Sequence, residues 1–579
     1  MSEEREFRIR PGRIRSKSTQ RARPFIAQAL AAAEKAGGRV TRAGKITSAG
    51  RSTFGRGRSA SVQANRHLTS RSRGAVVKAR VVRHAGKGPA LGTHLTYLRR
   101  EGVTRDGEKA KLFGPGGEEV DGKVFAERCA GDRHHFRFIV SPDDAVEMVD
   151  LRGFTHDLVG QMERDLRTKL DWAAVDHWNT EHPHIHVIMR GVRNDGENLV
   201  IARDYIKSGM RDRARDLITQ ELGPRTDLDI RRSLEKQVGL ERWTDLDRQL
   251  VRDADRNGVI DVAPHARQQP DELQVLKVGR LRKLESLGVA HEIGQGQWAI
   301  SENAETTLRE LGLRDDIIKR MHQSLVERGI ERSAGSYDLA GEHLDEPVLG
   351  RLVARGLVDE LRGSAFAVID GVDGRVHHVA LPNLDATGDS EAGSIVELRK
   401  FEDARGRNRM MLAVRSDLDI ERQVTATGAT WLDRQAVSHT STALADAGFG
   451  ADVKDAMDRR AEHLIGHGLA ERRGQRVVLA RNLLSTLRDR ELAVAGARLA
   501  TEGNCPFRST TEGEYVAGVY QRRLTLASGR FAMIDDGLGF QLVPWTPSLE
   551  SHLRQHVSGI VRGDKTIDWS FGRMRGLGL

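Results

Sequence analysis

The residues best suited to chemistry form a histidine-rich run between positions 176 and 186, Asp-His-Trp-Asn-Thr-Glu-His-Pro-His-Ile-His. Three of these histidines alternate, so on a strand they would project from one face: His182, His184 and His186. Pro183 favours a strand that begins near His184, and His177 would then end the preceding strand and fold back across a tight turn. Three converging imidazoles suit a divalent zinc, manganese, nickel or iron ion and leave open the coordination positions that catalysis requires.

Polar residues within the same run can support such a centre. Asp176, Asn179 and Glu181 are near enough to hydrogen-bond the second ring nitrogen of a metal-binding imidazole. A bond of that kind fixes the tautomer of the ring and its orientation. We therefore expect these side chains to assist the histidines without binding the metal themselves.

A candidate nucleophile lies upstream of the histidines. Tyrosine is scarce, with five in the chain, and Tyr97 stands beside Arg99 and Arg100 in Thr-His-Leu-Thr-Tyr-Leu-Arg-Arg-Glu-Gly. A phenol attacks phosphorus only when its pKa of about 10 is lowered or its proton is taken, and neighbouring cations favour the first. Alone, this segment is an ordinary amphipathic turn, so Tyr97 gains a role only next to a metal centre.

The elements that must position these residues can be read from hydrophobic periodicity. We predict strands at residues 75–83, 133–140, 172–177 and 184–190, and helices at 91–100, 155–170 and 202–222. Ser141-Pro142-Asp143 is a strong helix start. Strands mixed with separate helices, including one short hairpin, predict an α+β domain built on an antiparallel sheet over residues 75–225.

The charge distribution points to a polyanionic partner. The chain carries 92 Lys and Arg against 82 acidic residues, a formal charge of +10, yet residues 1–74 alone hold 18 basic and four acidic residues. The remaining residues are therefore slightly acidic. We expect residues 1–74 to be a largely disordered basic arm, apart from a short helix near residues 26–35. Such an arm on a near-neutral body favours nucleic acid as the partner.

Several other classes of protein are excluded. No run approaches 18 apolar residues, and the N-terminus lacks the apolar core of a signal peptide, so we expect a soluble cytoplasmic protein. The two cysteines, Cys129 and Cys505, provide no disulfide framework and no Cys-based zinc site. Residues 117–123 have P-loop spacing, but Val124 replaces the magnesium-binding Ser or Thr, so an ATP-driven motor is excluded.

The second half of the chain contains a repeated pattern of a helix ending in Gly followed by a two-stranded hairpin. Copies occur at residues 284–300, 352–368 and 464–479, and the pattern is typical of the end of a winged-helix unit. We divide this half into a helical, winged-helix-like module (226–330), a mixed α/β module (331–435), a second winged-helix-like module (436–500) and a small β module with a Gly/Arg-rich tail (501–579).

Three motifs together resemble one family. His177-x-Asn-x-x-x-x-His184-x-His186 resembles the histidine motif of the relaxases of mobilisable and conjugative plasmids, which are HUH-type DNA strand transferases. Residues 96–102 are similar to the nucleophile motif of the branch that includes the T-DNA border endonuclease, and residues 137–142 are similar to the motif between the two. The C-terminal half, including residues 543–545 and 569–573, is similar to the accessory region of a proteobacterial relaxase subgroup.

The resemblance implies a function and a set of site residues. A divalent ion, Mg²⁺ or Mn²⁺, would be held by His177, His184 and His186, and Tyr97 would cut single-stranded DNA at a transfer origin through a 5′-phosphotyrosyl link. The third motif position is usually Asp, so Asn179 leaves open whether Asp176 or Glu181 supports His177. DNA would meet these side chains: Lys87, Arg99, Arg100, Arg137 and Ser141. Implied partners are relaxosome proteins and a secretion coupling protein, and the resemblance also allows translocation with the bound DNA.

Two alternatives stay open. A rolling-circle replication initiator shares the metal chemistry, but there the histidine motif usually precedes the tyrosine, and the nearest downstream tyrosine is Tyr205. A basic, non-enzymatic DNA-binding protein with winged-helix modules would explain the charge but would leave the three motifs as coincidence.

Overall fold

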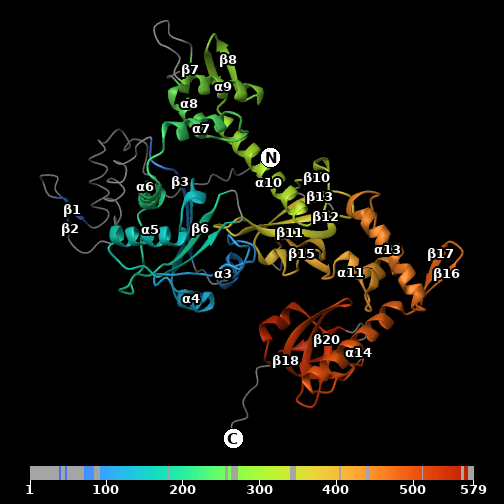
Figure 1. The fold of residues 1–579 in the computed structure, drawn as a ribbon. Helices are drawn as coiled ribbons and strands as arrows, with labels where there is room; N and C mark the ends of the chain where they lie inside the picture. The colour runs from blue at the N-terminus through green and yellow to red at the C-terminus, as the bar shows by residue number, and fades with distance from the viewer. Residues whose placement is uncertain are drawn as a thin grey trace, which may run out of the picture. The chain divides into compact units, whose positions relative to one another are not determined.

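The computed structural model describes residues 71–83, 91–178, 182–254, 258–262, 272–339, 347–402, 406–438, 442–511, 513–562 and 566–571, and the backbone of two short paired strands, Gly38–Val40 (β1) and Ile46–Ser48 (β2). The chain divides into two compact units, Met1–Ser233 and Leu234–Leu579, which we describe separately (Figure 1). The rest of the predicted arm, with its helix near residues 26–35, lies outside the described residues. Within the described ranges, no helix combines the length and apolar character needed to cross a membrane.

The first unit is built on a four-stranded antiparallel sheet, which confirms the expected α+β class. In sheet order the strands are β3 (Ala75–Arg83), β4 (His134–Pro142), β6 (His184–Arg190) and β5 (Trp172–His177). All four predicted strands are therefore confirmed. Every neighbouring pair is antiparallel, and β5 and β6 form the expected hairpin.

Helices cover both faces of this sheet. They are α3 (Leu91–Leu98), α4 (Gly122–Cys129), α5 (Leu151–Leu166) and α6 (Met210–Leu222), which follows a π-helical turn at Tyr205–Gly209. The side chains of α5 and α6 share one core with one face of the sheet, while those of α3 and α4 share a second core with the opposite face. The helix α4 was not predicted from the sequence.

The predicted helix start at Ser141-Pro142 is wrong. Pro142 is the last residue of β4 and pairs with Ala75, and α5 begins only at Leu151 with Asp150 as its N-cap. Proline lacks the N–H group that a residue inside a strand donates to its neighbour, but at the end of a strand this loss is tolerated. Pro142 can therefore end a strand here although proline is also common at helix starts.

The second unit contains two modules of the same construction. In the first, α7 (Asp227–Val238), which crosses the unit boundary, precedes α8 (Asp245–Asp253), β7 (Val259–Asp261), α9 (Glu272–Ser286), β8 (Ala290–Gly294), β9 (Gln297–Ile300) and α10 (Ala304–Val326). In the second, the order is α11 (Ile420–Thr425), α12 (Trp431–Val437), α13 (Gly448–Gly466), β16 (Ala470–Arg473), β17 (Arg476–Leu479) and α14 (Leu483–Gly503). We call residues 237–326 the first module and residues 423–503 the second module.

A buried arginine–aspartate pair lies at the centre of each module. Arg280 is fully buried, and its Nε and Nη2 each donate to Asp247 at 2.8 Å. Arg460 is 2% exposed and donates in the same way to Asp433. The aspartates belong to matching sequences, Thr-Asp-Leu-Asp-Arg-Gln at 244–249 and Thr-Trp-Leu-Asp-Arg-Gln at 430–435, and each closes a capping box at a helix start. Shared sequence and shared bonding identify an internal duplication.

The helix-and-hairpin pattern is confirmed in these two modules but wrong for residues 352–368. Those residues form two paired strands of a six-stranded sheet, in the order β10 (Tyr337–Asp338), β13 (Val376–Leu381), β12 (Ser364–Gly371), β11 (Leu349–Asp359), β14 (Ile395–Glu402) and β15 (Asn408–Ser416). A short apolar run such as Leu-Val-Ala-Arg-Gly suits a buried strand as well as a helix, and here strand partners decide.

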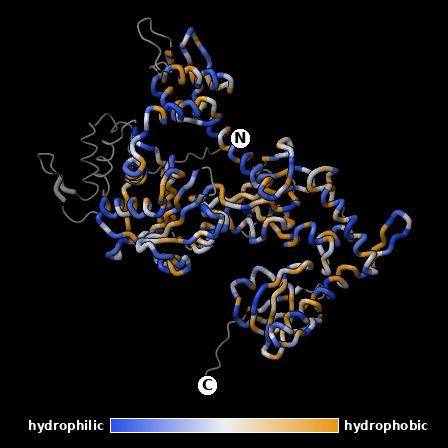
Figure 2. Tube along the Cα trace, in the orientation of Figure 1, coloured by the Kyte–Doolittle hydropathy of each residue, from blue (hydrophilic) through white to orange (hydrophobic). Residues whose placement is uncertain are grey.

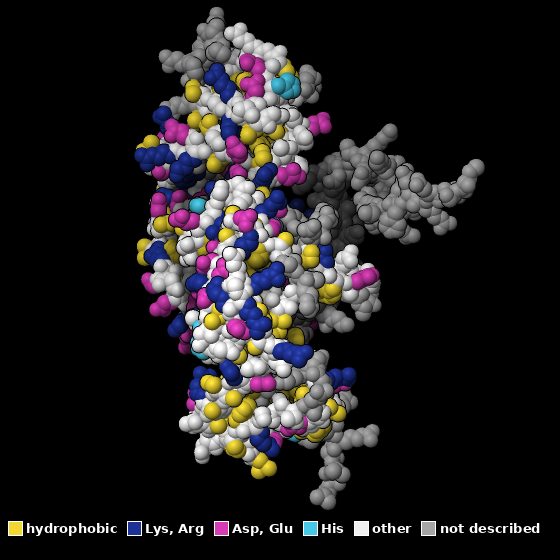
Figure 3. Space-filling model, turned by 90° about the vertical axis from the view of Figure 1, so that its right-hand side faces the viewer, with side chains coloured by type: hydrophobic (Ala, Val, Ile, Leu, Met, Phe, Trp, Pro, Cys, Tyr) yellow, Lys and Arg dark blue, Asp and Glu magenta, His cyan; other side chains and the backbone are white. Residues whose placement is uncertain are grey.

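The chain ends in a five-stranded antiparallel sheet, which confirms the expected β character of this region. Its order is β20 (Phe540–Pro544), β19 (Gly529–Asp535), β18 (Tyr515–Leu526), β21 (His556–Val561) and β22 (Ile567–Ser570). Figure 2 shows hydrophobic stretches concentrated in the strands of the sheets, whereas the tip of the β16–β17 hairpin is hydrophilic. Acidic and basic side chains are interspersed over the face shown in Figure 3, as expected for residues that are close to neutral after position 74.

Candidate metal centre

Three histidines converge on one face of the sheet in the first unit. His177 on β5 stands directly opposite His184 on β6, and His186 follows two residues later on the same face. Their ring centroids are 4.6–5.4 Å apart, and one ring nitrogen of each lies within 4.8 Å of the others. His177 and His186 are buried, and His184 is half-buried, so the cluster opens toward solvent on one side.

Backbone carbonyls fix the tautomers of two of these rings. Nε2 of His177 lies 2.8 Å from the carbonyl oxygen of Leu98, and Nδ1 of His184 lies 3.0 Å from that of His182. A carbonyl only accepts, so both of these nitrogens must carry the proton. The lone pairs therefore belong to Nδ1 of His177 and Nε2 of His184, which are the atoms that could bind a metal.

The expectation that Asp176 supports His177 is wrong. Side chains alternate along β5, so Asp176 lies on the opposite face, where it accepts hydrogen bonds from Arg152 at 3.0 Å and from the indole of Trp178 at 2.7 Å. The Leu98 carbonyl takes the supporting position instead. Glu181, the other candidate acid, lies outside the described residues, as does Asn179.

Tyr97 lies on the helix that provides this carbonyl. It is the penultimate residue of α3, next to Leu98, and its half-buried ring packs against the core shared by α3, α4 and the histidine-bearing face. The guanidinium of Arg100 lies 4.3 Å from the centroid of the ring. The contact between Leu98 and His177 thus ties the tyrosine-bearing helix directly to the histidine cluster.

A positively charged strip continues across the same face of the sheet. Arg137 on β4 lies opposite Ile188 of β6 on one side and Arg80 of β3 on the other. It is 6% exposed, and within the described residues no carboxylate pairs with it. Burial, together with the charge of Arg80, lowers the pKa of Arg137 to about 10, so the side chain stays charged at neutral pH. A buried cation without an acid partner is costly unless an anion joins it.

Other predicted contact residues are distributed unevenly. Ser141 lies at the histidine end of β4, where its hydroxyl donates to the carbonyl of Pro183 at 3.3 Å. Arg100 is at the tyrosine, whereas Arg99 turns toward Gly122 at the start of α4. Lys87 lies outside the described residues.

Three contributions were missed in the sequence. The Leu98 carbonyl carries no side-chain signal, because any residue can provide it. Lys78 and Arg80 are exposed on the histidine-bearing face of β3, and the alternation of residues 75–83 could have revealed them once β3 was paired with β4. His135 accepts a 3.0 Å hydrogen bond from Nε of Arg137 and so holds that buried guanidinium in place.

The donor set fits a divalent cation. Three neutral imidazoles, two of them oriented by carbonyls, offer a ligand set that suits first-row divalent metals and leaves positions for substrate. The P-loop-like segment at residues 117–123 does not offer the first amides of α4 to a phosphate, because the amides of Lys123 and Val124 already donate to the carboxylate of Asp121.

Comparison with known proteins yields one family. The model described as "Protein of unknown function (DUF3363)" matches residues 277–406 and 398–578, a span that excludes the histidine cluster. No curated protein and no solved structure matches the chain. Since the matched residues make up more than half of the sequence, the chain belongs to the DUF3363 family.

Proposed function

We propose that this protein is a DNA relaxase, a metal-dependent enzyme that nicks and rejoins single-stranded DNA at a transfer origin through Tyr97. The observation that carries the proposal is the hydrogen bond between His177 and the carbonyl of Leu98. It links a tyrosine-bearing helix to three converging histidines.

The surroundings of the cluster suit a phosphodiester. Arg100 places a cation beside the phenol, and Arg137 holds a second positive charge on the same sheet face. Lys78 and Arg80 extend that charge along β3, where a single strand could be tracked by its phosphates. A divalent ion held by His177, His184 and His186 would act as a Lewis acid on the non-bridging oxygens of one phosphate.

The reaction is a transesterification. The phenolic oxygen of Tyr97 forms a bond to phosphorus, the bond from phosphorus to the 3′ oxygen breaks, the phenol gives its proton to water and the 3′ oxygen takes one from water. The products are a 5′-phosphotyrosyl link and a free 3′-hydroxyl. One phosphoester replaces another, so the strand can be rejoined without ATP. In a bacterial cytoplasm, such a protein would act with relaxosome and coupling proteins.

The rolling-circle alternative loses its nucleophile. Tyr205 is fully buried in the core shared by α5 and α6, and its hydroxyl donates to Asp165 at 2.9 Å. Burial and the neighbouring Asp165 carboxylate raise the pKa of Tyr205 far above its ordinary value. A buried phenol with a high pKa cannot attack a phosphate, so Tyr97 is the tyrosine to test.

The test is incubation with Mn²⁺ and single-stranded oligonucleotides tiled across the DNA next to the gene, followed by denaturing electrophoresis. We expect a covalent protein–DNA adduct that disappears in Tyr97→Phe. Tyr515→Phe, which removes an exposed hydroxyl in the second unit, is the matched control and should behave as the wild type. Cleavage that survives Tyr97→Phe, or that releases a free 5′-phosphate, contradicts the proposal.

A further inference from the structure

The two modules can be superposed residue by residue at the start of their last helices. Ser301 donates its amide to Val289 in the first module, and Ala480 donates to Leu469 in the second. Both helices, α10 and α14, then begin after an asparagine. Glu302, Glu305 and Arg309 of the first module therefore correspond to Arg481, Leu484 and Arg488 of the second.

In the second module this place forms a cavity of about 420 Å³. Three arginines line it, namely Arg434, Arg481 and Arg488, and the first turn of α14 and Ser528 complete the wall. We call it the arginine cavity. Arg434 donates from Nη2 to the carbonyl of Ser528 at 2.6 Å. The positive N-terminal end of a 21-residue helix adds to the charge of the guanidinium groups.

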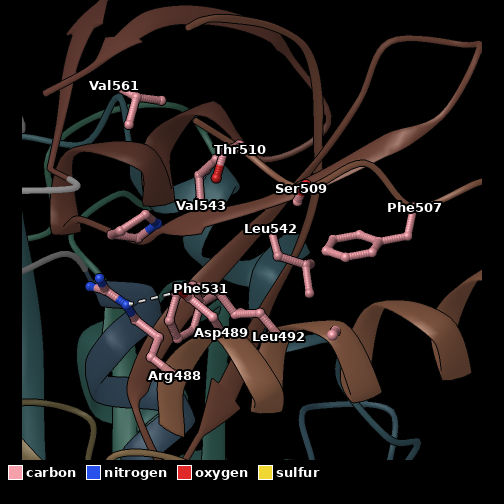
Figure 4. A pocket seen from close by; sticks show the side chains of 12 residues that line it. Arg488, Asp489, Leu492, Phe507, Ser509, Thr510, Phe531, Leu542, Val543 and Val561 are labelled. Carbon is pink, nitrogen blue, oxygen red and sulfur yellow. Dashed lines mark ion pairs between the residues drawn. The ribbon is translucent and has the colours of Figure 1, made fainter. Parts of the chain in front are cut away.

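The acids around these arginines offset their charge only in part. Nε of Arg488 is buried and forms a long ion pair with Asp489 at 3.9 Å (Figure 4), but it has no hydrogen-bond acceptor within the described residues. Glu491 is nearby, but its two oxygens accept from the amides of Ala527 and Ser528. Burial lowers the pKa of Arg434, and the charge of Arg488 lowers it further, as expected when cations crowd together.

The first module shows the same positions with the charges cancelled. Arg248, the counterpart of Arg434, pairs with Asp245 at 2.6 Å, and Arg309 pairs with Glu305 at 2.6 Å. In the second module, Trp431 and Leu484 replace those two acids, and Arg481 replaces Glu302. At this place the second module therefore has three fewer acidic residues and one more arginine than the first. Because the two modules otherwise share their fold, the difference in charge is specific to this place and does not reflect a generally basic composition.

The hairpin beside the cavity differs in the same direction. The β16–β17 hairpin carries exposed Arg472, Arg473 and Arg476, of which Arg472 pairs with Glu462 and Arg473 with Glu471, so Arg476 adds to its net positive charge. The β8–β9 hairpin has Glu292 and no arginine. Arg481 lies five positions after Arg476, a span of roughly 16 Å in an extended chain. That span is comparable to several nucleotide steps, so hairpin and cavity could meet successive phosphates.

The helix before the hairpin, α13, is not suited to bind in a groove of double-stranded DNA. The exposed side of α13 carries Asp455, Asp458 and Glu462, although Asp455 pairs with Arg459 of the same helix and Glu462 with Arg472 of the hairpin. Acidic side chains would be repelled by phosphates, so a polyanion should meet the hairpin and the cavity and avoid α13.

We propose that the second module binds the sugar–phosphate backbone of nucleic acid, with one phosphate in the arginine cavity and its neighbours along the β16–β17 hairpin. This contact is independent of strand cutting and would persist if Tyr97 proved inert. Because it reads phosphates, it should show little sequence preference and a marked dependence on salt.

The test measures binding of the full chain to fluorescein-labelled 30-nucleotide single strands and 30-base-pair duplexes of arbitrary sequence, in EDTA so that no cutting occurs. The key variant, Arg481→Glu with Leu484→Glu, rebuilds the charge pattern of the first module. We expect at least about tenfold weaker binding at 0.1 M salt and a slope of log K against log salt that is shallower by about 2, at roughly 0.9 per phosphate contact. The basic arm is present in both proteins, so its contribution cancels.

Two further variants decide the matter. Arg473→Ser with Arg476→Ser changes exposed side chains only and should weaken binding severalfold even if the cavity variant folds poorly. Arg248→Gln with Arg309→Gln makes the matched change in the first module and should leave affinity unchanged. Equal affinities and salt slopes for wild type, cavity variant and hairpin variant would overturn the proposal. The proposal would also fail if inorganic phosphate raised the melting temperature of the wild type but not of the cavity variant, while both proteins bound DNA equally well. The cavity would then be a site for small anions.

Discussion

Buried polar groups serve opposite purposes in the two units. In the first unit, His177 and His184 each bond a backbone carbonyl through one ring nitrogen and keep a lone pair on the other. In the second unit, Arg280 directs its donors to Asp247 and to four backbone carbonyls, and Arg460 does the same with Asp433 and three carbonyls.

The difference separates a site from a structural pair. A buried arginine whose donors are all used within the protein has nothing left to offer a ligand, and its burial serves the packing of its module. A histidine that donates one ring nitrogen to a backbone carbonyl directs the lone pair of its other nitrogen away from that carbonyl, here toward the neighbouring imidazoles. If candidate functional sites were chosen only by how buried and how polar their residues are, the arginine pairs would be chosen before the histidines. The distribution of hydrogen bonds is therefore the better guide to function.

Removing one histidine should have the largest effect on ligand binding and little effect on folding. We expect His184→Ala to weaken Mn²⁺ binding at least about 100-fold, because one of three ligands is lost. The free energy of unfolding should change by less than about 1 kcal/mol, since the side chain is half-buried. Electron paramagnetic resonance of Mn²⁺ measures the first quantity and urea unfolding the second. His291→Ala, at an exposed position, is the control. If His184→Ala bound Mn²⁺ as tightly as the wild type, the proposed metal centre would be wrong.

Breaking an arginine pair should give the reverse outcome. Arg460→Met leaves Asp433 buried without its partner, and we expect the second unit to lose about 3–5 kcal/mol of stability in urea unfolding. The adduct formed by Tyr97 should be unaffected. Replacing both residues, Arg460→Met with Asp433→Leu, should recover only part of the loss, because the capping box of α12 and the three carbonyls bonded by Arg460 also lose a partner. A single variant as stable as the wild type would show that the pair does not hold the module together.

His378 is a third kind of buried polar group, since its Nε2 has no hydrogen-bond partner within the described residues. Burial, with the charge of Arg320, lowers its pKa to about 4. The unfolded chain takes up a proton near pH 6.5, but the folded chain does so only near pH 4. Stability should therefore fall as the pH drops through this window, by about 3 kcal/mol in total. His378→Leu should flatten the unfolding free energy between pH 6.5 and 4, while His291→Leu, at an exposed position, should leave the slope as it is.

Much of the first unit could be predicted because its signals are local. Alternation along residues 75–83 and 184–190 is enough to place strands and to put His184 and His186 on one face. The same rule, applied one residue earlier on β5, would have put Asp176 on the face opposite His177. Sequence proximity was mistaken for spatial proximity at this position.

What could not be predicted depends on contacts between distant segments. The carbonyl of Leu98 reaches His177 across 79 residues and leaves no trace in side-chain type. Residues 352–368 become strands because β12 and β14 flank β11, which no local pattern specifies. The duplication was partly visible in the helix-and-hairpin pattern, but the buried pairs that define it join residues 27 and 33 positions apart.

The smallest predicted effect is the sharpest test of how the metal centre is oriented. Asp176→Asn keeps an acceptor for Arg152 and for the indole of Trp178 but removes the charge. If the Leu98 carbonyl fixes the tautomer of His177, Mn²⁺ affinity and adduct formation should both stay within about threefold of the wild type, because the changed side chain lies on the other face of the sheet. A carboxylate that polarised His177 would instead be worth 10–100-fold in metal affinity, roughly the effect of removing such a partner. A drop of that size in Asp176→Asn, at unchanged stability, would show that a carboxylate on the far face still governs the histidines, and that hydrogen-bond geometry alone does not separate site from scaffold.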